Sequence, residues 1–162
     1  MQYITYFKYL LLHKWYVFWA CLELGVPIWI AFFHDWDKFR WDMVKCYANF
    51  FYDKNGKDKR VWDKINGYYN PNETGNEEFD RLRERHIITN KHHWQYWKLG
   101  KQYIDMPDVY ILEMLADWKG AALAQGVNGR KVQTWYQLHK NEIKLSYDTK
   151  HKVETYLLGF DL

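Results

Sequence analysis

The feature that most constrains the fold is a long apolar segment near the N-terminus, at residues 3–24. Its apolar side chains fall on almost every face of a helix with 3.6 residues per turn, and they do not alternate as they would in a strand. A helix of this kind is usually buried on most sides. We therefore expect residues 3–24 to form a helix at the centre of a helical bundle.

The rest of the chain also favours helices. Apolar residues recur with a helical period in most segments, and no segment alternates like a strand bounded by hairpin turns. For a chain of 162 residues this predicts a single all-α domain over residues 1–162, with about seven helices. The helices expected after the first cover residues 28–33, 39–51, 77–99, 105–125, 132–139 and 149–158. We expect a polar turn at 53–58, one helical turn at 61–65 and a loop at 67–75.

Residues 15–33 approach the length and hydropathy of a membrane-spanning helix. Glu23 lies near the centre of this segment, and the Pro27 that follows would break a continuous helix. No small-residue cleavage site follows the apolar run, as it would in a signal peptide. We expect no membrane partner, and the two cysteines, Cys21 and Cys46, form no metal-binding or redox pair. Their apolar surroundings indicate buried thiols in a reducing compartment, the cytoplasm.

The charge balance limits the partners. A net charge of +3 is small for a general nucleic-acid binder, so no stable nucleic-acid complex is expected. It suits a local site for a small phosphorylated ligand. Aromatic residues make up 20% of the chain, which indicates a bulky core with a half-exposed rim; the alternative is a pocket whose rings stack on a flat ligand.

Histidine and acidic residues recur in a pattern that indicates a metal site. Buried imidazole and carboxylate groups need compensation, and both are natural ligands of divalent metal ions. The alternative is that these residues are structural or lie at the surface, as two adjacent imidazoles pointing apart would. The candidate metal ligands are His13, His34, Asp35, His86, His92, His93 and Asp117.

The order of these residues resembles the HD superfamily of metal-dependent phosphohydrolases. That superfamily has a separated His, an adjacent His-Asp pair, further His residues and a late Asp. The resemblance implies an HD-like helical bundle with one or two divalent ions, such as Mn, Fe, Co, Zn or Mg. It implies a first ion held by His13, His34, Asp35 and Asp117. A second ion would be held by His86 and one or both of His92 and His93, with Asp35 bridging.

Residues 34–38 are also similar to the His-Asp-x-x-Lys motif of the HD-GYP cyclic-dinucleotide phosphodiesterases. In that subfamily the lysine contacts a substrate phosphate, and Lys38 is the matching residue here. The Gly-Tyr-Pro segment of the subfamily is absent, so cyclic di-GMP is not implied. A closer resemblance is to a small uncharacterised family of phage and bacterial proteins. Its motifs match residues 34–39, 90–97, 105–107 and 113–118, and it brings no known activity.

Together these patterns predict hydrolysis of a phosphate ester or phosphodiester in a nucleotide-like molecule. Asp35, Lys38 and Glu113 are the expected catalytic residues, with Glu113 orienting a ligand imidazole. The expected substrate-binding residues are Lys38, Arg40, Lys91 and Trp94. Trp36 and Trp97, like Trp94, are candidates for stacking on a base, although core packing is the simpler reading for at least two of the three.

Two alternatives stay open at this point. One is a domain of the same type that binds a nucleotide without cleaving it. The other is a helical interaction module whose histidines are structural. Self-association of the chain is also left open.

Overall fold

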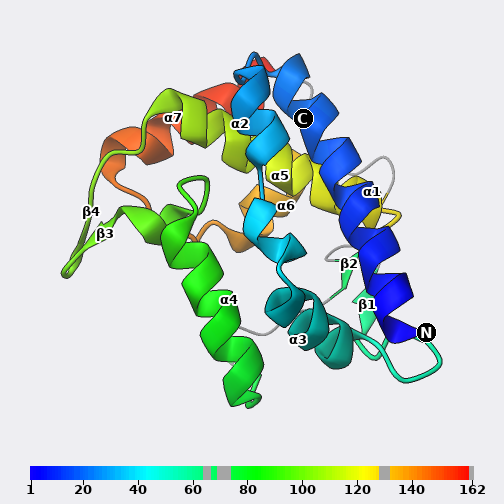
Figure 1. Cartoon of the computed structure of the whole chain (residues 1–162). Coiled ribbons are helices and arrows are strands. Elements are labelled where there is room, and N and C mark those ends of the chain that lie inside the picture. The colour runs from blue at the N-terminus through cyan, green and yellow to red at the C-terminus, as the bar shows by residue number, and fades with distance from the viewer. Residues whose placement is uncertain (64–66, 69–73, 128–131, 161–162) are drawn as a thin grey trace.

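The computed structural model describes residues 1–63, 67–68, 74–127 and 132–160 (Figure 1). Within these residues the regular structure is helical apart from two short antiparallel strand pairs, which confirms the predicted all-α class with seven α-helices. The helices are α1 (Gln2–Glu23), α2 (Ile28–Phe33), α3 (Trp41–Phe51), α4 (Glu77–Thr89), α5 (Asp108–Ala124), α6 (Val132–His139) and α7 (Tyr147–Gly159). Two 3-10 helices are η1 (Trp36–Phe39) and η2 (Trp94–Trp97). Antiparallel pairs form between β1 (Trp62–Asp63) and β2 (Gly67–Tyr68), and between β3 (Lys98–Leu99) and β4 (Gln102–Tyr103).

The packing of α1 against α5 is the most extensive helix contact in the described chain, and the two helices cross in Figure 1. A glycine on α5, Gly120, permits their close approach. A Cβ atom at this position would lie 2.4 Å from Cγ2 of Val17 and 2.7 Å from the backbone nitrogen of Val17. Because Gly120 has no side chain, the backbones of α1 and α5 can approach each other this closely.

Two clusters of buried apolar residues form the core, and α1 contributes to both. The N-terminal half of α1 supplies Tyr6 and Leu10 to a cluster with α3 and α4. The C-terminal half supplies Val17 and Cys21 to a cluster with α2, α5, α6 and α7. His13 lies on α1 between these two halves and is also buried. The boundary between the two apolar clusters is thus a place where polar side chains are enclosed.

The expectation that residues 3–24 form a helix buried on most sides is only half right. The helix forms over almost this range, but its apolar residues divide between a buried face and an exposed one. Phe7, Leu11 and Trp15 are among those with large exposed fractions. Composition could not distinguish the two faces, because both are apolar. No helix among the described residues is long and apolar enough to cross a membrane.

The most consequential boundary error concerns the helix expected at 77–99. It ends at Thr89, where the side-chain amide of Asn90 folds back and its Nδ2 donates to the carbonyl oxygen of His86, 2.8 Å away. The chain then leaves the helix and forms η2 and β3. Side-chain hydrogen bonding of this kind competes with helix continuation.

Smaller boundary differences occur elsewhere. The helix expected at 39–51 begins at Trp41 and is preceded by η1. Part of the helical turn expected at 61–65 is the strand β1, and part of the loop expected at 67–75 is β2. Residues 64–66 and 69–73, within and between those two segments, lie outside the described residues. The segment 28–33 and the segment 132–139 match α2 and α6.

Candidate metal centre

The segment after α2 directs two side chains into the bundle. The Asp35 backbone has a φ of 54°, the left-handed conformation, which Asp tolerates better than most residues. Lys14 on α1 supports this turn, since its ammonium donates to the carbonyl oxygens of Phe32 and His34, each 2.6 Å away. His34 and Asp35 are consequently only 2% and 1% exposed. Left-handed non-glycine residues concentrate at functional sites, and Asp35 fits that pattern.

A first group of possible ligands forms where α1, α5 and the start of η1 meet. It contains His13, His34, Asp35 and Asp117. The Nε2 atom of His13 lies 3.2 Å from Oδ1 of Asp117 and 3.4 Å from Oδ2 of Asp35. The Nε2 atom of His34 lies 3.4 Å and 3.5 Å from the same two oxygens. Two imidazoles and two carboxylates thus point their ligand atoms at a common centre.

A second group uses the other oxygen of Asp35. It contains Asp35, His86, His92 and His93. Oδ1 of Asp35 lies 3.3 Å from Nε2 of His86 and 3.3 Å from Nε2 of His92. Nε2 of His93 lies 2.9 Å from Nε2 of His86. Asp35 therefore joins the two groups, with one carboxylate oxygen facing each.

These separations fit metal coordination. Four ligands at about 2.1 Å from one ion in tetrahedral positions lie about 3.4 Å apart, close to the spacing in both groups. Several of the facing atoms are buried without a hydrogen-bond partner among the described residues, at a cost to stability unless something compensates them. They are Nε2 of His13, Nε2 of His34, Nε2 of His92 and Oδ1 of Asp35. The donor set is one that divalent transition metals prefer.

Two further carboxylates orient the imidazoles. Nδ1 of His34 donates to Oε1 of Glu113 at 2.9 Å, and Nδ1 of His92 lies 3.3 Å from the same oxygen. Nδ1 of His86 donates to Oδ2 of Asp37 at 2.8 Å. Each contact occupies Nδ1 and leaves Nε2 facing a ligand group, as is usual for imidazoles that bind metals. Glu113 was expected in this role, whereas the part played by Asp37 was not predicted.

The electrostatics of the cluster follow from this close packing. Burial acts to lower the pKa of His92, but contacts with the carboxylates of Asp35 and Glu113 outweigh it and raise the pKa to about 10. The pKa of His13 is also raised, because contacts with Asp117 and Asp35 outweigh burial. Burial and the neighbouring imidazoles lower the pKa of His93. The raised pKa values of His13 and His92 indicate that the carboxylates favour a positive charge between them, and a metal ion could supply that charge.

Lys38 lies beside the cluster, as predicted. Its ammonium donates to Oδ2 of Asp35 at 2.6 Å, and its side chain is only 18% exposed. It lines a cavity of about 480 Å³ that His13, His86, His93 and Asp117 also line. A cation therefore faces both the ligand groups and a cavity of the size of a small-molecule site.

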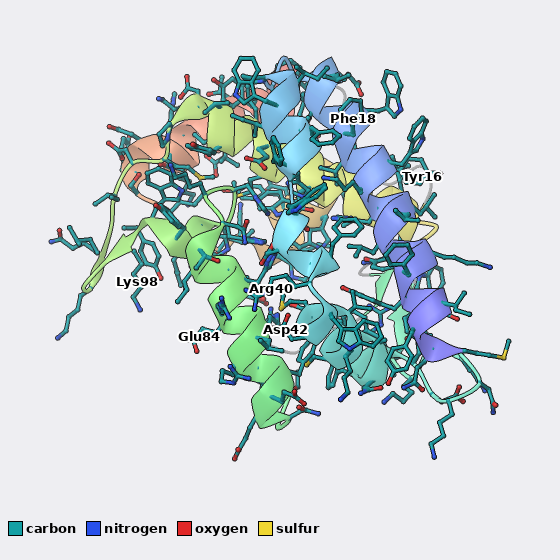
Figure 2. The ribbon with its side chains drawn as sticks, viewed as in Figure 1. Tyr16, Phe18, Arg40, Asp42, Glu84 and Lys98 are labelled. Carbon is teal, nitrogen blue, oxygen red and sulfur yellow. The ribbon has the colours of Figure 1, made fainter. Side chains whose placement is uncertain are left out.

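Of the other predicted substrate-binding residues, one lies at the cavity and two do not. Trp94 lines the cavity, whereas Arg40 and Lys91 are exposed and do not. Arg40 pairs with Asp42 at 2.9 Å, next to it at the start of α3 (Figure 2). Lys91 lies over the ring of Tyr110, 5.4 Å from its centroid. The structure thus does not bring these two cations into the site.

The two other tryptophans considered for stacking also lie away from the cavity wall. Trp36 is 55% exposed, and Trp97 packs against the apolar cluster of α5. The walls come instead from residues that sequence reasoning did not select. Among them are Tyr6, Tyr47, Arg60, Arg83, Trp118 and His139. They come from six separate segments of the chain, so no local spacing could have identified them.

Comparison with known proteins assigns the chain to a family. Residues 2–158 match the family described as "Family of unknown function (DUF5662)", and the chain belongs to that family. No curated protein and no solved structure matches the chain.

Proposed function

We propose that this protein is a metal-dependent phosphohydrolase of the HD type, acting on a phosphate ester of a nucleotide-like molecule. The observation that carries the proposal is the pair of ligand groups that share Asp35, with Lys38 at their edge. A carboxylate shared between two sets of imidazoles is suited to two neighbouring divalent ions. Such ions supply charge that activates water for attack on phosphorus and offsets the negative charge developing on the phosphoryl oxygens.

The protein side chains would do the remaining work. His13, His34, Asp35 and Asp117 would hold one ion, and His86, His92, His93 and Asp35 the other. Glu113 and Asp37 would fix the orientation of the imidazoles through their Nδ1 atoms. Lys38 would bind a non-bridging phosphate oxygen, because its ammonium already lies in the cavity beside Asp35.

The cavity favours a substrate that carries a ring. Tyr6, Tyr47 and Trp94 contribute to its walls, and Arg60 and Arg83 also line it, with Arg60 paired to Asp58 at 2.7 Å. Aromatic walls stack on flat rings. A cavity of about 480 Å³ is within the usual range for small ligands. These features suit a nucleotide better than a long polymer.

The test begins with the metal content of the purified protein, measured by elemental analysis. The metal-loaded protein is then assayed against a phosphomonoester, a phosphodiester and a panel of nucleotides. Lys38→Ala should keep its metal ions but lose about ten- to a hundredfold in turnover, since a charge-assisted hydrogen bond to phosphate contributes roughly 1.5–3 kcal/mol. Lys91→Ala is the matched control, because Lys91 is a lysine outside the cavity, and its turnover should be unchanged.

Two results would contradict the proposal. Protein that binds no divalent metal would leave the histidines with a structural role. Metal-loaded protein that binds a nucleotide tightly but cleaves none of the panel would identify a domain that sequesters its ligand.

A further inference from the structure

The outer side of α1 and the neighbouring α2–η1 segment carry an unusual apolar surface. On α1 the residues Ile4, Phe7, Leu11, Trp15 and Trp19 recur at intervals of three or four, so they form one stripe along the helix. Phe32, Phe33 and Trp36 extend this stripe on α2 and η1. All eight side chains are between 43% and 64% exposed. We call these eight residues the aromatic face.

Contacts join the two parts of the aromatic face into one surface. The ring of Phe39 contacts that of Phe7 on α1 and that of Trp36 on η1, with centroids 6.0 Å and 5.8 Å apart. The ammonium of Lys14 on α1 lies 6.0 Å from the ring centroids of both Phe32 and Trp36. Figure 1 shows α2 beside α1, in agreement with the contacts between these helices.

The aromatic face is larger than a soluble monomer usually exposes. Eight half-exposed side chains present on the order of 800 Å², since a large aromatic side chain has roughly 150–250 Å² of surface. The largest apolar patch of a typical monomer is about 300–600 Å². One side of a standard protein interface buries about 800 Å². The aromatic face therefore has the area that one subunit of a stable dimer needs.

We propose that the aromatic face is a homodimer interface, with the aromatic face of a second copy of this chain as its partner. Homodimer interfaces are more apolar than the interfaces of transient complexes, and their centres are enriched in aromatic residues and depleted of charge. A two-fold axis would place the α1 stripe against the same stripe of the partner, the usual way in which an apolar helix face is covered.

The charges around the aromatic face support a protein partner over a lipid surface. Residues 1–34 contain two lysines, Lys8 and Lys14, and one acidic residue, Glu23. The Lys14 ammonium is bound to two backbone carbonyls, and Glu23 pairs with Lys119 at 2.8 Å. Anionic membranes are usually recognised by clusters of four to eight basic residues, roughly, which this surface lacks. Few uncompensated charges would oppose each other across the two-fold axis.

The test is the mass of the full chain in solution at micromolar concentration, by sedimentation or by light scattering after size exclusion. The unmodified chain should have twice the 20.0 kDa mass of one chain. Trp15→Glu and Leu11→Glu should each shift the mass to that of a single chain. Both positions are about half exposed, so circular dichroism should show an unchanged helical fold. Leu99→Glu, at an exposed leucine on the β3–β4 hairpin, is the matched control and should remain a dimer.

Three results would overturn the proposal. The unmodified chain could be a monomer, or the two α1 variants could remain dimers, which would place the interface elsewhere. A monomer that sediments with vesicles of neutral lipid would identify the aromatic face as a membrane-binding surface instead. The inference does not depend on the proposed catalytic activity.

Discussion

Asp35 is the residue on which both ligand groups depend. Its two oxygens face different sets of imidazoles, at distances of 3.3–3.5 Å. Asp117 belongs to the first group and not to the second, so substitutions at Asp35 and at Asp117 should have different effects.

We predict that Asp35→Ala removes both ions, whereas Asp117→Ala removes one. The reason is that a metal site without this carboxylate loses a ligand and the negative charge that offsets the charge of the ion. Elemental analysis after dialysis gives the number of ions per chain. Asp42→Ala is the control, because Asp42 is exposed and pairs with Arg40 outside the cavity. Equal metal contents in the Asp35 and Asp117 variants would exclude a shared ligand.

Asp37 permits a second prediction for a single residue. Its carboxylate accepts a hydrogen bond from Nδ1 of His86 but does not belong to either ligand group. Asp37→Ala should therefore weaken metal binding by about ten- to a hundredfold without abolishing it, as is typical when a residue that orients a ligand is removed. Titration with a competing chelator measures this change. Affinity equal to that of the unmodified protein would show that the imidazole of His86 needs no such support.

At the scale of helices, the site depends on how closely α1 approaches α5. His13 lies on α1 and Asp117 on α5, and their side chains are 3.2 Å apart. Gly120 lies one turn after Asp117, where the backbone of Val17 is too close for a Cβ atom.

We predict that Gly120→Ala lowers the free energy of unfolding by about 1–3 kcal/mol, the usual effect of inserting a methyl group into a well-packed core. It should also weaken binding at the ion site that contains His13 and Asp117, because the helices must separate. Chemical denaturation and a metal titration measure the two effects. Gly159→Ala is the control. A Cβ atom there meets nothing within 4 Å, so the free energy of unfolding should change by no more than about 1 kcal/mol. A fully stable Gly120→Ala protein would show that α1 and α5 adjust without cost.

At the scale of the whole molecule, metal binding should be linked to proton release and to stability. In the metal-free protein the pKa of His92 is raised from 6.5 to about 10, so below pH 6.5 its protonated form contributes fully to stability. That contribution is lost as the pH rises through about 10. A metal ion binds the neutral imidazole and must therefore displace this proton.

We predict that metal binding at a pH between 6.5 and 10 releases at least one proton per chain. An imidazole with an unshifted pKa would release almost none in the upper part of that range. Calorimetric titrations in two buffers with different ionisation enthalpies count the protons. The affinity for the metal ion should fall as the pH is lowered. Removing the metal with a chelator should lower the melting temperature of the protein. A binding enthalpy that is independent of the buffer would contradict this linkage.

Local patterns in the sequence were sufficient for the helical class, for the bounds of α2 and α6, and for a set of histidine and acidic residues that the fold brings together. Periodicity is a local property, so helices with a strong apolar period can be predicted without tertiary information. The wrong helix boundary at 77–99 did not affect the choice of candidate ligands. His92 and His93 still reach the cluster, from the segment after Thr89.

Only the tertiary structure decided which residues surround that cluster and which face solvent. Asp37 orients His86 from a position 49 residues away, and the cavity walls come from segments scattered over the chain. Arg40 has a charge like that of Lys38 and lies two residues later, yet it pairs at the surface. Both faces of α1 are apolar in composition, and packing against α3 and α5 buries one of them. Burial depends on which elements meet in space, and that information is not contained in the spacing of residues along one helix.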